Sequence, residues 1–279
     1  MSDRVVTIVG LGLMGGSLGL ALKKGSFAGT VRGYARRSET RALAGSRSVV
    51  DEVFDSLDAA VADADIVVFC TPVCSVAPLI KDCLASLKDG AVVTDVGSTK
   101  AKLSKAVAEV LSDQNVLYVG SHPVCGSEQD GLEAAQDDLY AGAVTVVDEG
   151  AADDLVRMWE SIGSRVVELS PERHDAVLAR TSHIPHLLAS LLVEFVADGP
   201  DESGALCGSG FRDTTRVAGG PANVWRDILV SNAEEVAEGL LSYREKIDDV
   251  LALLEAKDAD GLERLLDSAR THRESLGAD

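Results

Sequence analysis

The chain has 279 residues, enough for one large domain or two ordinary ones, and 46% of them are hydrophobic, as in soluble globular proteins. Its formal net charge of −19 is spread along the sequence, which argues against nucleic acid and against anionic membrane surfaces as partners, because both need a basic face. Five cysteines form no C-x-x-C pair, no run of about 18 apolar residues offers a membrane span, and we expect no signal peptide, so we expect a cytoplasmic protein.

The first half of the chain alternates short β-branched runs with segments of helical period. Helices are predicted, for example, over Met14–Lys24 and Leu57–Ala62. Continuous apolar strands separated by helices form parallel sheets that are covered on both faces, so the pattern predicts a doubly wound α/β domain. Two further runs, Ala143–Val147 and Arg165–Leu169, would extend that sheet. The strands predicted before them are Val5–Val9, Thr30–Tyr34, Ile66–Cys70, Ala91–Asp95 and Val116–Val119.

The pattern becomes helical after residue 170. Helices are predicted over Leu187–Val196, Val224–Leu254 and Gly261–Arg273, with a loop over Gly199–Gly210. The long helix Val224–Leu254 carries an apolar stripe that a domain of this size cannot cover alone, so we expect a homodimer. We therefore divide the chain into an α/β domain, residues 1–170, and an all-helical domain, residues 171–279.

A glycine-rich loop lies between the first predicted strand and the first predicted helix. It contains Gly10, Gly12, Leu13, Met14 and Gly15 in the pattern G-x-G-x-x-G. The first glycine permits a tight turn, the second lets the backbone approach a pyrophosphate, and the third lets the helix pack on the strand. The helix N-terminus then offers free N–H groups to the phosphates. The loop predicts a dinucleotide site, and the alternative is a glycine turn without a ligand.

The end of the second predicted strand indicates which dinucleotide binds. NAD-binding domains of this kind place an acidic residue about 20 residues beyond the glycines, where it binds the ribose 2′-hydroxyl. Here that position falls on Ala35, Arg36 and Arg37, so the acid is missing and two guanidinium groups lie where a 2′-phosphate would bind. We therefore expect NADP to be favoured over NAD. The alternative is a solvated basic turn before a helix.

Three polar clusters remain. Residues 95–100 (DVGSTK) and 121–128 (SHPVCGSE) each follow a predicted strand, where parallel strands open onto the ligand crevice of a doubly wound sheet. The third cluster lies in the helical half and combines residues 182–186 (SHIPH), 211–216 (FRDTTR) and 225–227 (WRD). These side chains are candidates for a substrate site.

Seven segments in register resemble the prephenate/arogenate dehydrogenase family of tyrosine biosynthesis: GLGLMGGS, CTPV, DVGSTK, SHPVCGSE, HDAVLARTSHIPH, FRDTTRVA and WRDI. The resemblance covers nearly the whole chain. It implies a Rossmann-type domain followed by an all-helical dimerisation domain, with the active site between them. It also implies a reaction that oxidises the ring C4 alcohol of a cyclohexadienyl substrate, passes hydride to the nicotinamide and releases the ring carboxylate as CO₂.

The resemblance assigns the catalytic groups and part of the cofactor site. His122 matches the imidazole that accepts the hydrogen bond of the C4 hydroxyl, a task suited to a neutral ring, and Ser98 would hydrogen-bond nearby. Thr71 and Pro72, in the CTPV segment, would belong to the cofactor site. A structural histidine that caps the turn at Pro123 is the alternative for His122.

The resemblance also assigns substrate contacts. The substrate is a small dicarboxylate, and a guanidinium group can bind a carboxylate through two parallel bonds, so Arg216 is the expected anchor. His183 and Trp225 match further pocket positions, and Glu128 would gate the pocket or hydrogen-bond near it. The alternatives are a surface arginine for Arg216, a core residue for Trp225 and a solvated acid for Glu128.

Two other functions fit parts of the sequence. One is another β-hydroxyacid-type NADP dehydrogenase, which would place a lysine in its catalytic helix, whereas the SHIPH segment has none. The other is a non-catalytic NADP-binding sensor, which would need only the glycine loop. The histidine and cysteine spacings match no zinc site, so no metal is expected. The sequence separates neither prephenate from arogenate nor tyrosine-inhibited from uninhibited enzymes, and we expect no fused mutase or regulatory domain.

Overall fold

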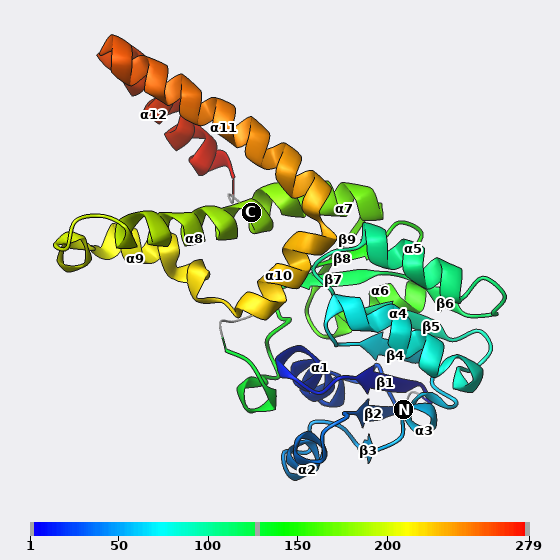
Figure 1. The fold of residues 1–279 in the computed structure, drawn as a ribbon. Helices are drawn as coiled ribbons and strands as arrows, with labels where there is room; N and C mark the ends of the chain where they lie inside the picture. The colour runs from blue at the N-terminus through cyan, green and yellow to red at the C-terminus, as the bar shows by residue number, and fades with distance from the viewer. Residues whose placement is uncertain (1–2, 126–128, 277–279) are drawn as a thin grey trace. The chain divides into compact units, whose positions relative to one another are not determined.

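The computed structural model describes residues 3–125 and 129–276. By its internal contacts the chain separates into two compact units, residues 1–233 and residues 234–279. The first unit contains both β-sheets and the helices up to α10, and the second contains nearly all of α11 together with α12 (Figure 1).

Six strands form a sheet whose pairs are all parallel, in the order β3-β2-β1-β4-β5-β6 (Figure 1). The direction in which successive strands are added reverses between β1 and β4, and doubly wound sheets bind ligands at such a switch point. This confirms the predicted fold class. The strands are β1 Val5–Val9, β2 Thr30–Tyr34, β3 Glu52–Phe54, β4 Ile66–Phe69, β5 Val92–Asp95 and β6 Leu117–Tyr118.

Helices cover both faces of this sheet, and each face has its own hydrophobic core. Alternate residues of one strand enter different cores: Ile8 of β1 packs with α1, α2 and α6, whereas Val9 packs with α3, α4 and α5. Strand β4 alternates in the same way, so its residues are apolar without interruption. The helices are α1 Leu13–Lys24, α2 Ser38–Ser46, α3 Leu57–Val61, α4 Val73–Asp82, α5 Ala101–Val110 and α6 Asp153–Ser161.

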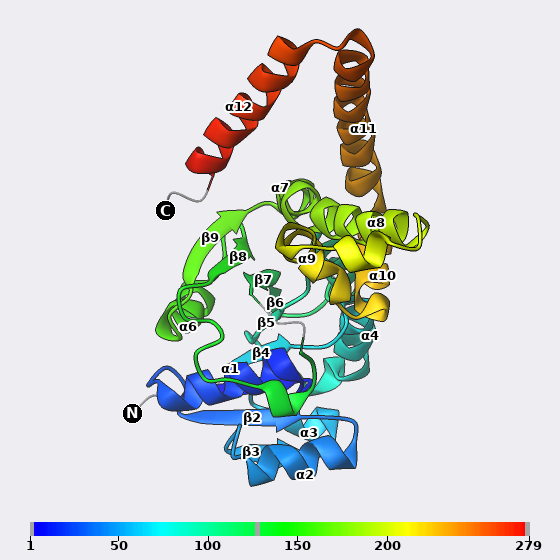
Figure 2. The ribbon, with the colours of Figure 1, turned by 90° about the vertical axis from the view of Figure 1, so that its left-hand side faces the viewer.

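A second sheet has three strands, β7 Ser121–Val124, β8 Val144–Asp148 and β9 Arg165–Leu169 (Figure 2). Strand β8 pairs with β7 antiparallel and with β9 parallel. The prediction that the β8 and β9 runs would extend the main sheet is therefore wrong. The chain turns at Gly120, after the two-residue strand β6, and the returning strand β7 becomes the neighbour of β8. No strand is predicted from the sequence at β7, which contains Pro123.

The helical half of the first unit packs against these sheets. Helix α7, Pro171–Leu178, begins where Ser170 caps it by accepting a hydrogen bond from Arg173 N at 3.2 Å. A π-helical turn, Ala179–His183, joins α7 to α8, Ile184–Ala197. The predicted loop after α8 contains a 3₁₀ turn, Ser203–Leu206, and the start of the next helix. The remaining elements are α9 Ser209–Thr215, a 3₁₀ turn Arg216–Gly219 and α10 Ala222–Ser231.

The continuous helical run Pro171–Ala197 is long and apolar enough to cross a membrane by length and composition, with a mean hydropathy of 1.2, contrary to our expectation from the sequence. A core helix of a soluble protein passes the same test. Here the run carries two buried polar side chains, His174 and Asp175, which hydrogen-bond to each other and, through Asp175, to the start of α5. These contacts pack the first part of the run, α7, against α5, whereas Leu191 and Phe195 of α8 are exposed.

The long helix predicted over Val224–Leu254 is interrupted at Asn232. Helix α10 ends at Ser231, and α11 runs over Ala233–Ala256. Asn232 is buried, and its side-chain N–H groups bond to the carbonyl of Asp175 and to the His183 ring, at 2.8 and 3.1 Å. The prediction of one continuous helix is therefore wrong. The apolar pattern continues through Asn232 and does not show the break, whereas the side-chain amide of this residue makes tertiary hydrogen bonds.

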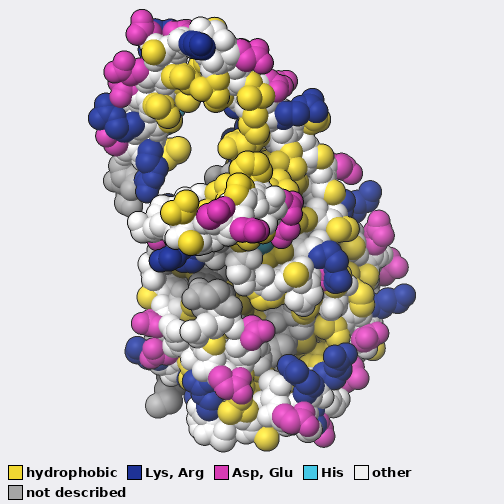
Figure 3. All heavy atoms as spheres, turned by 60° about the vertical axis from the view of Figure 1, so that its left-hand side comes forward, with side chains coloured by type: hydrophobic (Ala, Val, Ile, Leu, Met, Phe, Trp, Pro, Cys, Tyr) yellow, Lys and Arg dark blue, Asp and Glu magenta, His cyan; other side chains and the backbone are white. Residues whose placement is uncertain are grey.

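The second unit consists of α11 and α12, Ala259–Ser275, whose N-terminus is capped by Asp258. Large apolar side chains stay exposed along both helices, as Figure 3 shows in yellow. These exposed side chains are Leu241, Tyr243, Ile247, Leu251, Leu254, Leu265 and Leu266.

Candidate active site

The glycine loop forms the turn from β1 to α1. Gly10 has a φ of 102°, and a Cβ there would lie 2.6 Å from the carbonyl oxygen of Cys70. A Cβ on Gly15 would lie 1.9 Å from the Gly10 carbonyl oxygen. Both glycines are therefore required by the packing of the protein itself. A Cβ on Gly12 would meet no atom within 4 Å, so the backbone at the N-terminus of α1 faces open space.

Thr71 lies directly against this loop. It follows β4, and its methyl carbon would be 2.9 Å from a Cβ on Gly10. Its hydroxyl is buried and makes no hydrogen bond within the described residues. Pro72 is exposed and precedes the first residue of α4. An open backbone at Gly12 and an unpaired hydroxyl beside it fit a dinucleotide, whose phosphate oxygens accept hydrogen bonds.

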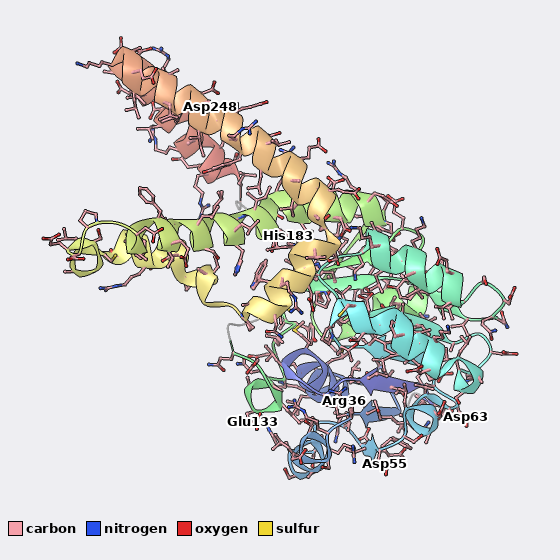
Figure 4. All side chains as sticks on the ribbon, viewed as in Figure 1. Arg36, Asp55, Asp63, Glu133, His183 and Asp248 are labelled. Atoms are coloured by element: carbon pink, nitrogen blue, oxygen red, sulfur yellow. The ribbon has the colours of Figure 1, made fainter. Side chains whose placement is uncertain are left out.

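The end of β2 carries the two predicted arginines. Ala35 is buried, whereas Arg36 and Arg37 are exposed at the start of α2, and Figure 4 labels Arg36. Arg41 fixes the turn, since its guanidinium donates to the carbonyls of Ala35 and Arg36 at 2.9 and 2.8 Å. In the part of the chain that the structure describes, neither Arg36 nor Arg37 forms a salt bridge with a carboxylate. Both guanidinium groups are therefore available to an anion.

A chain of hydrogen bonds begins at His122, on β7. His122 Nδ1 lies 2.8 Å from His174 Nε2, and His174 Nδ1 lies 2.8 Å from an Asp175 carboxylate oxygen. Burial, together with the positive charge of Lys100 and the neighbouring histidines, holds the pKa of His122 well below its ordinary value. The ring is therefore neutral near pH 7 and able to accept a proton.

The Asp175 carboxylate is fixed at the start of α5. One oxygen accepts the N–H of Lys100 at 2.8 Å, and the other accepts the N–H of Ala101 at 2.9 Å. Burial alone would raise the pKa of Asp175, but these bonds and the one from His174 lower it overall. The carboxylate is therefore ionised near neutral pH and held in one orientation.

His183 is joined to the same network by Asn232. The ring is buried, and burial lowers its pKa to about 4, partly opposed by Asp175. Because the Asn232 amide donates to His183 Nδ1, the ring proton of His183 resides on Nε2. That nitrogen is buried and makes no hydrogen bond to another described residue, although the backbone of Ser98 lies close. His183 Nε2–H is thus a donor without a partner, near Ser98.

Trp225, on α10, packs against His183 and against His186 of α8. Its ring stacks on His186 with centroids 3.5 Å apart and an angle of 10° between the planes, and the His183 ring meets it edge-on at 6.4 Å. Trp225 is half-buried, and His186 Nδ1 is a further buried nitrogen with no partner among the described residues. The two histidines and Trp225 therefore form an aromatic wall from the π-helical turn, α8 and α10; Figure 4 labels His183.

One predicted substrate contact is not joined to this network. Arg216 is the first residue of the 3₁₀ turn Arg216–Gly219; it is exposed and forms no salt bridge within the described ranges. Glu128 lies outside the described residues. Ser98 is half-buried on the loop after β5, and the structure gives His122 the partner His174 rather than Ser98.

The loop that carries Ser98 is anchored by a buried ion pair, which we did not predict. Lys100 Nζ lies 2.5 Å from Asp95, and both side chains are almost fully buried. Asp95 also accepts hydrogen bonds from the Tyr118 hydroxyl at 2.9 Å and from Gly97 N at 2.7 Å. His174, Asp175 and Asn232 were missed as well. The segment HDAVLARTSHIPH already contained the first two, but nothing local in the sequence links them to His122.

Comparisons with known proteins identify the family. The family profile "Prephenate dehydrogenase, nucleotide-binding domain" matches residues 18–168, and "Prephenate dehydrogenase, dimerization domain" matches residues 170–268. A prephenate dehydrogenase of Bacillus subtilis is 31% identical, over 99% of this chain and 76% of its own length.

Two solved structures also match. A prephenate dehydrogenase of A. aeolicus, in complex with hydroxyphenyl propionate and NAD⁺, has a TM-score of 0.90 at 29% identity and covers 99% of both chains. Synechocystis arogenate dehydrogenase has a TM-score of 0.85 at 27% identity, covering 98% of this chain and 100% of that one. Together with the two profiles, which span most of the sequence, these matches show that the chain belongs to the prephenate dehydrogenase family.

Proposed function

We propose that this protein catalyses the oxidative decarboxylation of prephenate, arogenate or both, giving 4-hydroxyphenylpyruvate or tyrosine. Its membership in the family supports this, as do relatives named for each of the two substrates. The observation that carries the proposal is His122, a neutral and oriented imidazole close to the loop that bears Ser98 and to the helix that bears His183. A dinucleotide sensor would have no use for such a base.

His122 Nε2 is the ring nitrogen available for the substrate, because Nδ1 is bonded to His174. As the C4 alcohol is oxidised, its O–H proton passes to His122 Nε2. When bound, the nicotinamide supplies the acceptor for two electrons and the C4 hydrogen. Loss of the ring carboxylate then yields an aromatic product, so the protein's task is to hold the C4 hydroxyl against His122.

His183 and Trp225 form the wall of the substrate pocket in this proposal. The unpartnered N–H of His183 donates to a substrate oxygen, which removes the cost of a buried donor without an acceptor. Arg216 binds a substrate carboxylate through its guanidinium group, and its exposure leaves it free to do so. We assign Ser98 to the same site, and Glu128 keeps the role that the family resemblance implies.

The cofactor we propose is NADP in preference to NAD, bound by the glycine loop with Leu13, Met14, Thr71 and Pro72. The support is that the residue directly after β2 is the buried Ala35 and no acid, and that Arg36 and Arg37 are exposed and form no salt bridge among the described residues. Replacing Ala35→Asp together with Arg36→Ser should shift the preference toward NAD. A wild-type kcat/KM for NAD equal to or above that for NADP would contradict the proposal.

We further propose that residues 1–170 bind the dinucleotide and that residues 171–279 complete the substrate site and form a homodimer. The matched dimerisation profile and the exposed apolar side chains of α11 and α12 support this. Light scattering should report a dimer at micromolar concentration, and a monomer would contradict it. We place the enzyme in the cytoplasm, without a metal and without nucleic-acid or membrane partners.

Initial rates with two substrates and two cofactors test the function directly. The wild-type protein should reduce NADP with prephenate, arogenate or both, and His122→Asn should lower kcat by roughly 10²- to 10⁴-fold with a smaller change in KM. Absence of cofactor reduction with either substrate would overturn the proposed function. A His122→Asn variant with nearly full turnover would remove His122 from the mechanism.

A further inference from the structure

The hydrogen-bonded chain that begins at His122 continues to His174 and Asp175. Neither of these two residues has a role in the reaction as proposed above. His174 is completely buried, and Asp175 is almost so. Burying polar groups costs desolvation free energy. A complete hydrogen-bonded chain behind a base offsets that cost and holds the base in one orientation. The arrangement therefore calls for a function.

We propose that His174 and Asp175 are positioning residues that set the tautomer of His122, so that its Nε2 carries a lone pair toward the substrate hydroxyl. The inference rests on the proposed role of His122 as the proton acceptor. It follows from the geometry in three steps.

The first step is the direction of each hydrogen bond. An ionised carboxylate only accepts, so His174 must donate its Nδ1–H to Asp175. In the proposed arrangement His174 is neutral, so its Nε2 carries the lone pair and His122 donates its Nδ1–H to it across 2.8 Å. His122 Nε2 is consequently unprotonated. Free imidazoles in water favour the opposite tautomer, so the buried carboxylate imposes a form that His122 would not adopt by itself.

The second step is that the Asp175 carboxylate, at the end of the hydrogen-bonded chain, is held rigidly. The two Asp175 oxygens are held by the N–H groups of Lys100 and Ala101, and the Asp175 carbonyl accepts the Asn232 amide. The N-terminus of α5 also favours a negative charge at this point. The carboxylate therefore has no freedom to turn away from His174.

The third step is charge. Besides His174, the groups that act on His122 are the Lys100 ammonium, which is paired with Asp95, and the His183 ring. When the substrate O–H bond breaks and the Nε2–H bond forms, His122 becomes an imidazolium next to a lysine. Its Nδ1–H stays on His122 and becomes a charge-assisted donor to His174, and the Asp175 carboxylate offsets the new charge. No oxidation or reduction occurs within the three residues.

The tautomer can be observed without any substrate. In protein labelled with ¹⁵N-histidine, which has five histidines to assign, the ring shifts of His122 should show Nδ1 protonated and Nε2 unprotonated. The reverse pattern in the wild-type protein overturns the proposal, whether or not the enzyme is active. Failure of the proposed function would appear instead as a lack of turnover with the predicted tautomer present.

A pair of variants at His174 tests the kinetic consequence. His174→Phe keeps a ring but removes the acceptor, and it should lower kcat by roughly 10²- to 10⁴-fold with little change in KM or in the Kd for NADPH. His174→Gln restores an acceptor oxygen and should recover most of that loss. His272→Phe, the same substitution at an exposed histidine of α12, is the matched control and should keep the wild-type kcat.

Asp175→Asn separates charge from orientation. The amide oxygen should face His174, because there it keeps two N–H donors, whereas the reversed amide keeps one. The ¹⁵N pattern of His122 should then persist while kcat falls about tenfold, from the weaker bond of a neutral acceptor. Wild-type kcat in both His174→Phe and Asp175→Asn would overturn the proposal and leave the function of the enzyme intact. If His174→Phe does not fold, the tautomer of the wild-type protein and the kcat of Asp175→Asn still test the proposal.

Discussion

The two substitutions Gly12→Ala and Gly15→Ala should separate ligand binding from folding. Both add one methyl group to the same loop. At Gly12 the methyl group meets no protein atom within 4 Å, and φ is −97°, a value that alanine adopts readily. At Gly15 it would lie 1.9 Å from the Gly10 carbonyl oxygen, well inside van der Waals contact.

The magnitudes follow from these contacts. Gly12→Ala gains roughly 0.4–1 kcal/mol from the lower entropy of the unfolded chain and loses a similar amount because alanine is a poor N-cap, so its free energy of unfolding should change by less than about 1 kcal/mol. Gly15→Ala should lose about 3 kcal/mol or more, because backbone must move. The Gly12 methyl group should instead push the pyrophosphate away from the N-terminus of α1. Loss of one charge-assisted hydrogen bond there, worth about 1.5–3 kcal/mol, weakens dinucleotide binding roughly tenfold to a hundredfold.

Urea unfolding and a fluorescence titration with NADPH measure both quantities without a substrate. We expect Gly12→Ala to unfold like the wild type and to bind NADPH at least about tenfold more weakly. A Kd within about twofold of the wild-type value would refute the inference that the Gly12 backbone approaches the ligand. A large loss of stability in Gly12→Ala would show that the open space belongs to the protein's own packing.

Three further predictions concern single side chains. Lys100→Met should lower the free energy of unfolding by about 3–5 kcal/mol, since it leaves Asp95 charged and buried, and near-wild-type urea stability would contradict this. Arg216→Gln should raise KM for the cyclohexadienyl substrate by the equivalent of roughly 2–5 kcal/mol without changing the Kd for NADPH, and an unchanged KM would show that another cation binds the carboxylate. For His183, the folded-state pKa of about 4 lies below the unfolded value near 6.5, so the unfolded state binds the proton first and stability should fall by roughly 3 kcal/mol as the pH drops through that window. His183→Gln should flatten this part of the stability curve, and an unaltered slope would assign the loss to other groups.

The local pattern of the sequence was sufficient for the elements that position the cofactor. Strands β1, β2, β4 and β5 are short runs rich in β-branched residues, so each is predicted within a residue or so of its bounds. The glycine loop was equally clear, because its G-x-G-x-x-G spacing is contiguous in the chain and Gly15 meets the Gly10 carbonyl within one strand-turn-helix unit, although the close contact of Gly10 itself is with Cys70 after β4. The absence of an acidic residue at the end of β2 could also be recognised, since the strand and the turn that follows it are contiguous in the chain. These are local features, and a local pattern records them.

Contacts between distant segments were beyond the reach of that pattern. The second sheet depends on the pairing of β7 with β8. Hydrogen bonds between the strands decide this pairing, and the apolar runs of β8 and β9 do not specify it. Asn232 interrupts a regular apolar stripe only because its amide finds Asp175 and His183 in the folded chain. The sequence alone determined the class of fold, the glycine loop and the family's candidate base, His122. Only the tertiary structure decided which groups surround that base, because residues 122 and 174 lie on different elements and meet through packing that no spacing along the chain encodes.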